Sequence, residues 1–113
     1  MILSTHTLDS SNGTHAAGID VQLVALLNNN ELKEIWSKKT DQTGRLVVNF
    51  EIKPEYQNCE LKLTYNIENY FKKIGKGVQT SSITLNIKLP DPKGNYHLPI
   101  IISPHGASLW WSN

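Results

Sequence analysis

Hydrophobic and polar residues alternate with a period of two along most of this chain. Between positions 2 and 8 the alternation places His6 on one face and Thr5 on the other, which is typical of a strand. The same spacing predicts strands over seven further segments: 19–27, 32–38, 45–50, 59–67, 82–89, 96–103 and 107–112. Because these segments are short and separated by turn-forming residues, they predict an all-β fold, an antiparallel sandwich of about eight strands.

The residues between these segments predict the connections. Asn28, Asn29 and Asn30 tolerate positive backbone angles, so the strands on either side should form a hairpin, with Trp36 on its inner face. Turn-forming residues at 9–13 follow the first strand directly, so no local partner is expected for it. Residues 68–74 lack the period of two and stop at a glycine, which indicates one or two helical turns.

The last nineteen residues are the most hydrophobic part of the chain. They run from Asn95 through an apolar segment and a turn at 103–106 to Trp110 and Trp111. Terminal segments are normally polar and frayed unless something holds them. We therefore expect this segment to be packed, either within the domain or against another subunit.

Composition limits the class of protein. The 113 residues suit one domain, residues 1–113, and 39% hydrophobic residues are too many for a disordered chain. The net charge is +1 and no basic stripe is present, so nucleic acid is not an expected partner. No apolar run approaches the roughly 20 residues of a membrane span, so no membrane partner is expected either.

The single cysteine, Cys59, cannot form an internal disulfide and is expected to be a buried, inert thiol. The first residues lack the basic and apolar regions of a secretory signal. A cytoplasmic location is therefore expected.

Histidines are the candidate chemical groups. The spacing of His6, His15, His97 and His105 fits no zinc motif, so we expect no metal site. His15 lies in a predicted loop and His105 in a predicted turn, and both are expected to be exposed bystanders. His6 and His97 lie in strands among apolar neighbours. The simpler interpretation is that each is a half-buried structural histidine whose ring is hydrogen-bonded, and the alternative is that each acts as a catalytic acid or base. The residues alone thus predict a β domain with two histidines of interest.

Several motifs in order resemble one family, the 5-hydroxyisourate hydrolases, which are transthyretin-related enzymes of urate degradation. The resemblance rests on Ile2-Leu-Ser-Thr-His6, Gly44-Arg45, Asn69-Tyr-Phe-Lys-Lys73, Tyr96-His-Leu-Pro99 and Ile101-Ile-Ser103. It spans essentially the whole chain. It implies a transthyretin-like sandwich of two four-stranded sheets, assembled as a homotetramer that is a dimer of dimers.

The resemblance also implies the site. In this family a histidine of the first strand, an arginine after a glycine turn and a histidine of the Tyr-His-x-Pro segment line a cleft between dimers. They fall on His6, Arg45 and His97, which become the expected catalytic residues, with no cofactor.

The C-terminal motif departs from the family. Where its members carry Tyr-Arg-Gly-Ser, this chain has Trp110, Trp111, Ser112 and Asn113. We expect Trp110, Trp111 and Asn113 to contact substrate, although tryptophan in place of arginine loses a permanent cation and five donors.

This departure leaves alternatives to the hydrolase open. One is a diverged protein that binds an aromatic ligand in the tetramer cleft. Another is an enzyme acting on a different cyclic amide. A purely structural sandwich is disfavoured because His6, Arg45 and His97 are all present.

Overall fold

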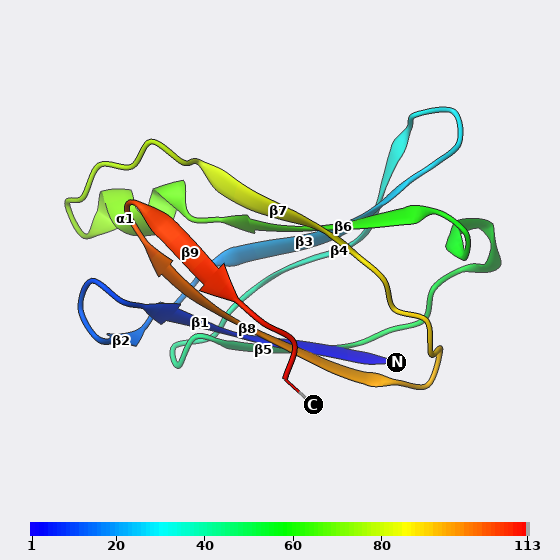
Figure 1. Cartoon of the computed structure of the whole chain (residues 1–113), viewed down its shortest axis with the longest axis horizontal. Coiled ribbons are helices and arrows are strands. Elements are labelled where there is room, and N and C mark those ends of the chain that lie inside the picture. Colours follow the sequence, from blue (N-terminus) through cyan, green and yellow to red (C-terminus); the bar gives the residue numbers. More distant parts are fainter. Residues whose placement is uncertain (113) are drawn as a thin grey trace.

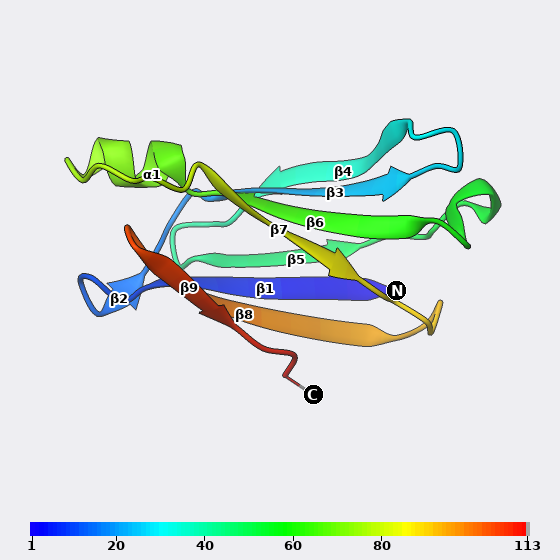
Figure 2. The ribbon, with the colours of Figure 1, turned by 45° about the horizontal axis from the view of Figure 1, so that its top comes forward.

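The structure is a computed structural model that describes residues 1–112, and its strands form two facing sheets (Figures 1 and 2). One sheet contains β1 (Ile2–Asp9), β2 (Thr14–His15), β5 (Arg45–Asn49), β8 (Asn95–Ser103) and β9 (Gly106–Leu109). The other contains β3 (Asp20–Leu26), β4 (Leu32–Lys39), β6 (Glu60–Asn66) and β7 (Ser82–Ile87). A 3-10 turn, η1 (Pro54–Tyr56), precedes β6, and a short helix, α1 (Glu68–Lys73), follows it.

The second sheet has the strand order β4-β3-β6-β7, and all its pairs are antiparallel. In the first sheet, β8 pairs with one edge of β1, while β5 and β2 pair with the other edge. The β1–β8 pair is parallel, the one exception among the strand pairs of residues 1–112 to the predicted antiparallel arrangement. Parallel neighbours need a long connection, and here the rest of the domain provides it.

Most predicted elements are present. Trp36 is buried on β4, Asn30 has φ of 67°, and α1 ends just before Gly75. The first strand does have a local partner, because the two-residue strand β2 returns antiparallel to its end. The last strand is shorter than predicted, since β9 ends at Leu109.

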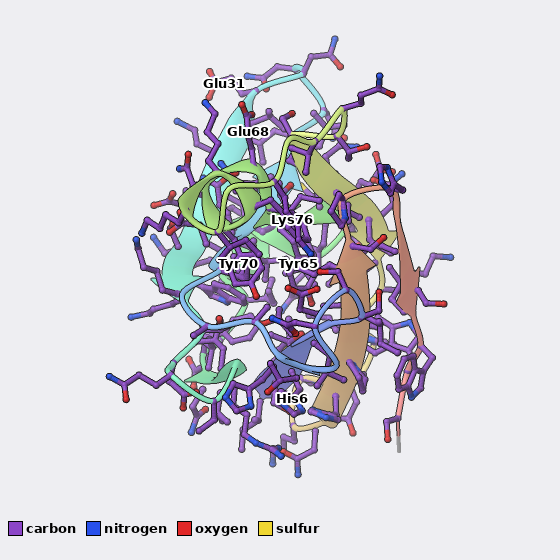
Figure 3. All side chains as sticks on the ribbon, turned by 90° about the vertical axis from the view of Figure 1, so that its left-hand side faces the viewer. His6, Glu31, Tyr65, Glu68, Tyr70 and Lys76 are labelled. Carbon is purple, nitrogen blue, oxygen red and sulfur yellow. The ribbon has the colours of Figure 1, made fainter. Side chains whose placement is uncertain are left out.

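The core fills the space between the two sheets. Apolar side chains of β3, β6 and β8 are buried there: Val21, Leu23, Ala25, Leu61, Leu63, Tyr65, Leu98, Ile100 and Ile102. The side of β1 that faces them is partly polar. Thr5 donates a hydrogen bond to the carbonyl of Leu98 at 2.6 Å and lies 2.7 Å from the hydroxyl of Tyr65. Because β1 alternates, Ser4 and His6 project from the outer side of the sheet, and Figure 3 shows His6 on the side of β1 away from Tyr65.

The C-terminal segment is packed in part. Strand β8 is central in its sheet and largely buried, as expected. The two indoles after β9 are not covered, since Trp110 is 45% and Trp111 44% exposed.

Cys59 is half-buried just before β6 instead of fully buried within a strand. Within residues 1–112, no helix has the length and apolar character needed to cross a membrane.

Candidate functional site

His6, Arg45 and His97 project from three adjacent strands on the outer face of the first sheet. His6 on β1 is the register partner of Arg45 on β5, and His97 on β8 is the register partner of Ser4. Strands in a sheet lie about 4.8 Å apart and rise about 3.3 Å per residue, so the Cα atoms of the two histidines lie about 8 Å apart. The structure therefore brings together the three groups expected to be catalytic, which we name the outer-face triad: His6, Arg45 and His97.

The turn before β5 sets the position of Arg45. The carboxylate of Asp41 accepts hydrogen bonds from the backbone N–H of Thr43 at 2.8 Å and from that of Arg45 at 3.0 Å. Hydrogen bonds from Thr43 and Arg45 lower the pKa of Asp41, so it accepts them as a carboxylate. Gly44 has φ of 78°, and a Cβ at this position would collide with the carbonyl oxygen of Thr7. The glycine therefore allows β5 to begin directly beside β1.

His6 is half-buried and its ring is held by this turn. Its Nε2 lies 3.0 Å from the carbonyl oxygen of Thr43. Burial lowers the pKa of His6, and the nearby charges of Arg45, His15 and His97 lower it further, while the bond to Thr43 partly opposes them. His6 is thus neutral near pH 7 and can act as a hydrogen-bonding group or a base.

His97 is also half-buried, as predicted, and is held by a hydroxyl group. Its Nδ1 lies 2.7 Å from Oγ of Ser4, and its backbone carbonyl accepts a 2.8 Å hydrogen bond from the N–H of Ser112. We did not predict a role for Ser4 from the sequence. A signal was present, because Ser4 precedes His6 by two residues in a strand of period two and so shares its face.

The side chains of Trp110 and Trp111 point to opposite faces of the first sheet. Trp110 donates its backbone N–H to the carbonyl of Pro99, and this pairing places it on the face that carries His97. Trp111 falls on the other side, where its ring meets Tyr96 edge-to-face with centroids 6.3 Å apart. The structure therefore brings Trp110, but not Trp111, to the outer-face triad. Asn113 lies outside the described residues.

The remaining two histidines differ in their distance from this site: His15 is the register partner of Leu8 and its charge lowers the pKa of His6, whereas His105 lies beyond the far end of β8. His15 and His105 are exposed, as predicted, the first in β2 and the second in the turn between β8 and β9. Over residues 1–112, no three of the His, Cys, Asp and Glu side chains are grouped to hold a metal ion.

Neither of two hollows in the structure includes the outer-face triad. One, of about 230 Å³, lies beside α1, and the other, of about 910 Å³, lies between the segments 51–61 and 86–93. Arg45 is exposed and the two histidines are half-buried, so the triad lies on an open part of the sheet face.

The fold and site define a class of protein: a transthyretin-like β-sandwich with two imidazoles and one guanidinium on its outer sheet face. A family model described as HIUase/Transthyretin family matches residues 3–111. The chain belongs to this family.

Individual relatives support the same placement. The 5-hydroxyisourate hydrolase of Deinococcus radiodurans is 26% identical over 111 residues, which cover 96% of this chain and 92% of the relative. The structure of 5-hydroxyisourate hydrolase from Klebsiella pneumoniae matches with a TM-score of 0.81 at 26% identity and covers all of both chains. Sea bream transthyretin in complex with thyroxine matches with a TM-score of 0.81 at 18% identity, covers 97% of this chain and 93% of its own, and shows the fold alone. The predicted transthyretin-like sandwich is confirmed, although residues 1–112 form sheets of five and four strands instead of the two four-stranded sheets that the resemblance implied.

Proposed function

We propose that this chain hydrolyses 5-hydroxyisourate, opening its ring to give 2-oxo-4-hydroxy-4-carboxy-5-ureidoimidazoline. The observation that carries the proposal is the register that places His6 beside Arg45 and His97 beside Ser4 on one sheet face. Relatives named 5-hydroxyisourate hydrolase, similar over nearly the whole chain, support it. A cytoplasmic location remains a prediction.

The three side chains supply what hydrolysis of a cyclic amide needs. Arg45 orients a planar, readily ionised substrate through charge-assisted hydrogen bonds from its guanidinium. One histidine accepts a proton from water as the water oxygen bonds to the ring carbonyl carbon. Hydrogen bonds to the carbonyl oxygen stabilise the charge that develops there. The C–N bond then breaks, the nitrogen takes up a proton, and the product carries the new carboxylate.

The state of His6 supports this chemistry. Since burial and the charge of Arg45 hold its pKa below the ordinary value of 6.5, the ring is neutral near pH 7. Because the His6 ring is neutral, it adds no second positive charge that would repel the guanidinium of Arg45.

We also propose that the working unit is a homotetramer, a dimer of dimers, with the site closed between subunits. The outer face carries exposed apolar groups beside the triad: Val47, the register partner of Ser4, is 69% exposed, and Trp110 is 45% exposed. Exposed apolar groups around polar ones are typical of an interaction surface. Covering this face would exclude water from the triad and strengthen its electrostatic contacts.

The direct test is to generate 5-hydroxyisourate from urate with urate oxidase and to follow its ultraviolet decay with and without the protein. We expect faster decay with the wild-type chain, a large loss in His6→Asn, His97→Gln and Arg45→Gln, and no loss in His105→Asn, whose histidine is exposed and away from the site. Decay at the spontaneous rate with folded wild-type protein would contradict the proposal.

A second candidate is binding of an aromatic ligand in the same cleft. Trp110 favours it, because a half-exposed indole lies on the face of the triad. Sea bream transthyretin forms a complex with thyroxine, so a protein of this fold binds an aromatic ligand. Quenching of fluorescence by such a ligand, lost in Trp110→Phe and kept in Trp111→Phe, without turnover of 5-hydroxyisourate, would favour binding. Turnover of another cyclic amide in the same assay would instead favour a redirected hydrolase.

A further inference from the structure

Ser4 makes two polar contacts across the parallel β1–β8 pair. Its Oγ lies 2.7 Å from Nδ1 of His97 and donates a 3.3 Å hydrogen bond to the carbonyl oxygen of Tyr96. Ser4 is half-buried, so its hydroxyl is only partly available to water. The question is therefore which atom of Ser4, Tyr96 and His97 donates the hydrogen in each contact.

The hydrogen count decides the direction of the bonds. A serine hydroxyl has one hydrogen to donate, and a carbonyl oxygen can only accept. If the Ser4 hydroxyl donates to the carbonyl of Tyr96, its oxygen is free to accept a hydrogen from Nδ1 of His97. In the opposite arrangement, Ser4 donates to Nδ1 and the contact with the Tyr96 carbonyl has no hydrogen. Only the first arrangement makes both hydrogen bonds.

We propose that Ser4 is a positioning residue that holds neutral His97 as its Nδ1–H tautomer. The ring nitrogen that remains unprotonated is then Nε2, at the far end of the ring from the backbone. This inference rests on the proposed hydrolysis and assigns its proton acceptor: Nε2 of His97 takes the proton from the attacking water. The partner of one imidazole nitrogen sets which nitrogen reacts, as in other functional histidines.

His6 is held in the opposite way. The carbonyl of Thr43 can only accept, so Nε2 of His6 must carry the hydrogen in their 3.0 Å contact. The neutral His6 ring therefore has its lone pair on Nδ1, while its Nε2–H is already in use. The two histidines are thus different chemical groups although they share one sheet face, and only His97 presents an unprotonated Nε2.

The tautomer can be measured without activity. In the ¹⁵N-labelled full-length protein, NMR correlations between ring nitrogens and carbon-bound ring protons, recorded at a pH where the spectra no longer change, distinguish protonated from unprotonated nitrogens. We expect a protonated Nδ1 for His97 and a protonated Nε2 for His6. A protonated Nε2 on His97 in the wild-type protein would overturn the proposal.

Variants connect the tautomer to turnover. Ser4→Ala removes the hydroxyl, and we expect His97 to shift toward the Nε2–H form and kcat to fall about 10- to 100-fold, the range found when the residue that orients a metal-binding histidine is removed. Ser4→Thr keeps the hydroxyl and should restore both readouts. Ser10→Ala is the matched control, since the hydroxyl of Ser10, the residue just after β1, also donates to a β8 carbonyl, that of Ile102 at 3.2 Å.

The outcomes separate this inference from the proposed function. If wild-type protein shows the Nδ1–H tautomer but no turnover, hydrolysis fails and the role of His97 Nε2 as its acceptor falls with it. If turnover is present but Ser4→Ala keeps the wild-type kcat, or loses no more than Ser10→Ala does, the positioning role of Ser4 is wrong while hydrolysis stands.

Discussion

His6 on β1 and Arg45 on β5 are direct cross-strand partners, and the guanidinium adds to the effect of burial in lowering the pKa of the imidazole beside it. Side chains opposed in this way have Cβ atoms about 5 Å apart. The pair links the two parts of the proposed mechanism, because the group that would hold the substrate anion also helps burial to favour the neutral form of a neighbouring histidine.

The first prediction concerns this pair. Arg45→Gln should raise the pKa of His6 toward its ordinary value of 6.5, since burial then acts without the positive charge that lowers the pKa further. It should also lower kcat/KM about 10- to 100-fold through loss of charge-assisted hydrogen bonds. NMR titration of the His6 ring and the ultraviolet assay measure the two effects.

Arg45→Lys is the control for that prediction. It keeps the positive charge, so the pKa of His6 should stay low, but it loses the planar pair of donors, so activity should still fall. A His6 pKa that does not change in Arg45→Gln would mean that the two side chains do not interact as the register implies.

The second prediction concerns the turn that leads into β5. Gly44→Ala should destabilise the fold by at least about 2 kcal/mol, because a Cβ there combines a positive φ with a collision against the Thr7 carbonyl. Gly13→Ala is the matched control: its φ is 74° but nothing lies within 4 Å, so the cost should be about 1 kcal/mol. Urea unfolding of both variants measures the difference, and equal losses would contradict the proposed close approach.

The third prediction concerns a buried carboxylate at the end of β1. Burial tends to raise the pKa of Asp9, but hydrogen bonds from Ser11 and Tyr70 and the charge of Lys76 outweigh it and hold the pKa below 3.8. The hydroxyl of Tyr70 lies 2.8 Å from the carboxylate and comes from α1, so this bond joins the helix to the first sheet (Figure 3).

A carboxylate with a lowered folded-state pKa stabilises the fold above its unfolded pKa, and this contribution is lost as the pH falls through the folded value. Wild-type protein should therefore be more stable than Asp9→Asn above pH 3.8, and the difference should shrink below it. Urea unfolding at several pH values tests this, and Tyr70→Phe should show a smaller form of the same effect. Parallel pH profiles for wild type and Asp9→Asn would rule it out.

The fourth prediction concerns assembly. Val47→Glu places a charge on the outer face beside the triad and should break the proposed tetramer into smaller species with reduced activity, while each chain stays folded. Leu32→Glu is the control, because Leu32 is 59% exposed on the other sheet, at the start of β4. Light scattering during size-exclusion chromatography measures the mass. If wild-type protein is already monomeric, or both variants remain tetrameric, this face is not the interface.

Local patterns predicted most of the elements. The period of two identified the strands. Successive side chains of a strand face opposite sides, so hydrophobic and polar residues alternate wherever only one side is buried. Asparagines and glycines identified turns such as that at Asn30, because few other residues adopt a positive φ. The resemblance of motifs such as Ile2-Leu-Ser-Thr-His6 named the family and its candidate residues, His6, Arg45 and His97.

Pairing between distant segments depended on the tertiary structure. The sequence does not show that β1 and β8 run parallel, nor that Ser4 therefore meets His97, because register is set by packing of the whole core and not by local spacing. The same holds for the two tryptophans. Successive residues of an extended chain point to opposite sides, so the sequence indicates that the two indoles diverge. Only the pairing with β8 determines that Trp110 faces the triad and that Trp111 contacts Tyr96.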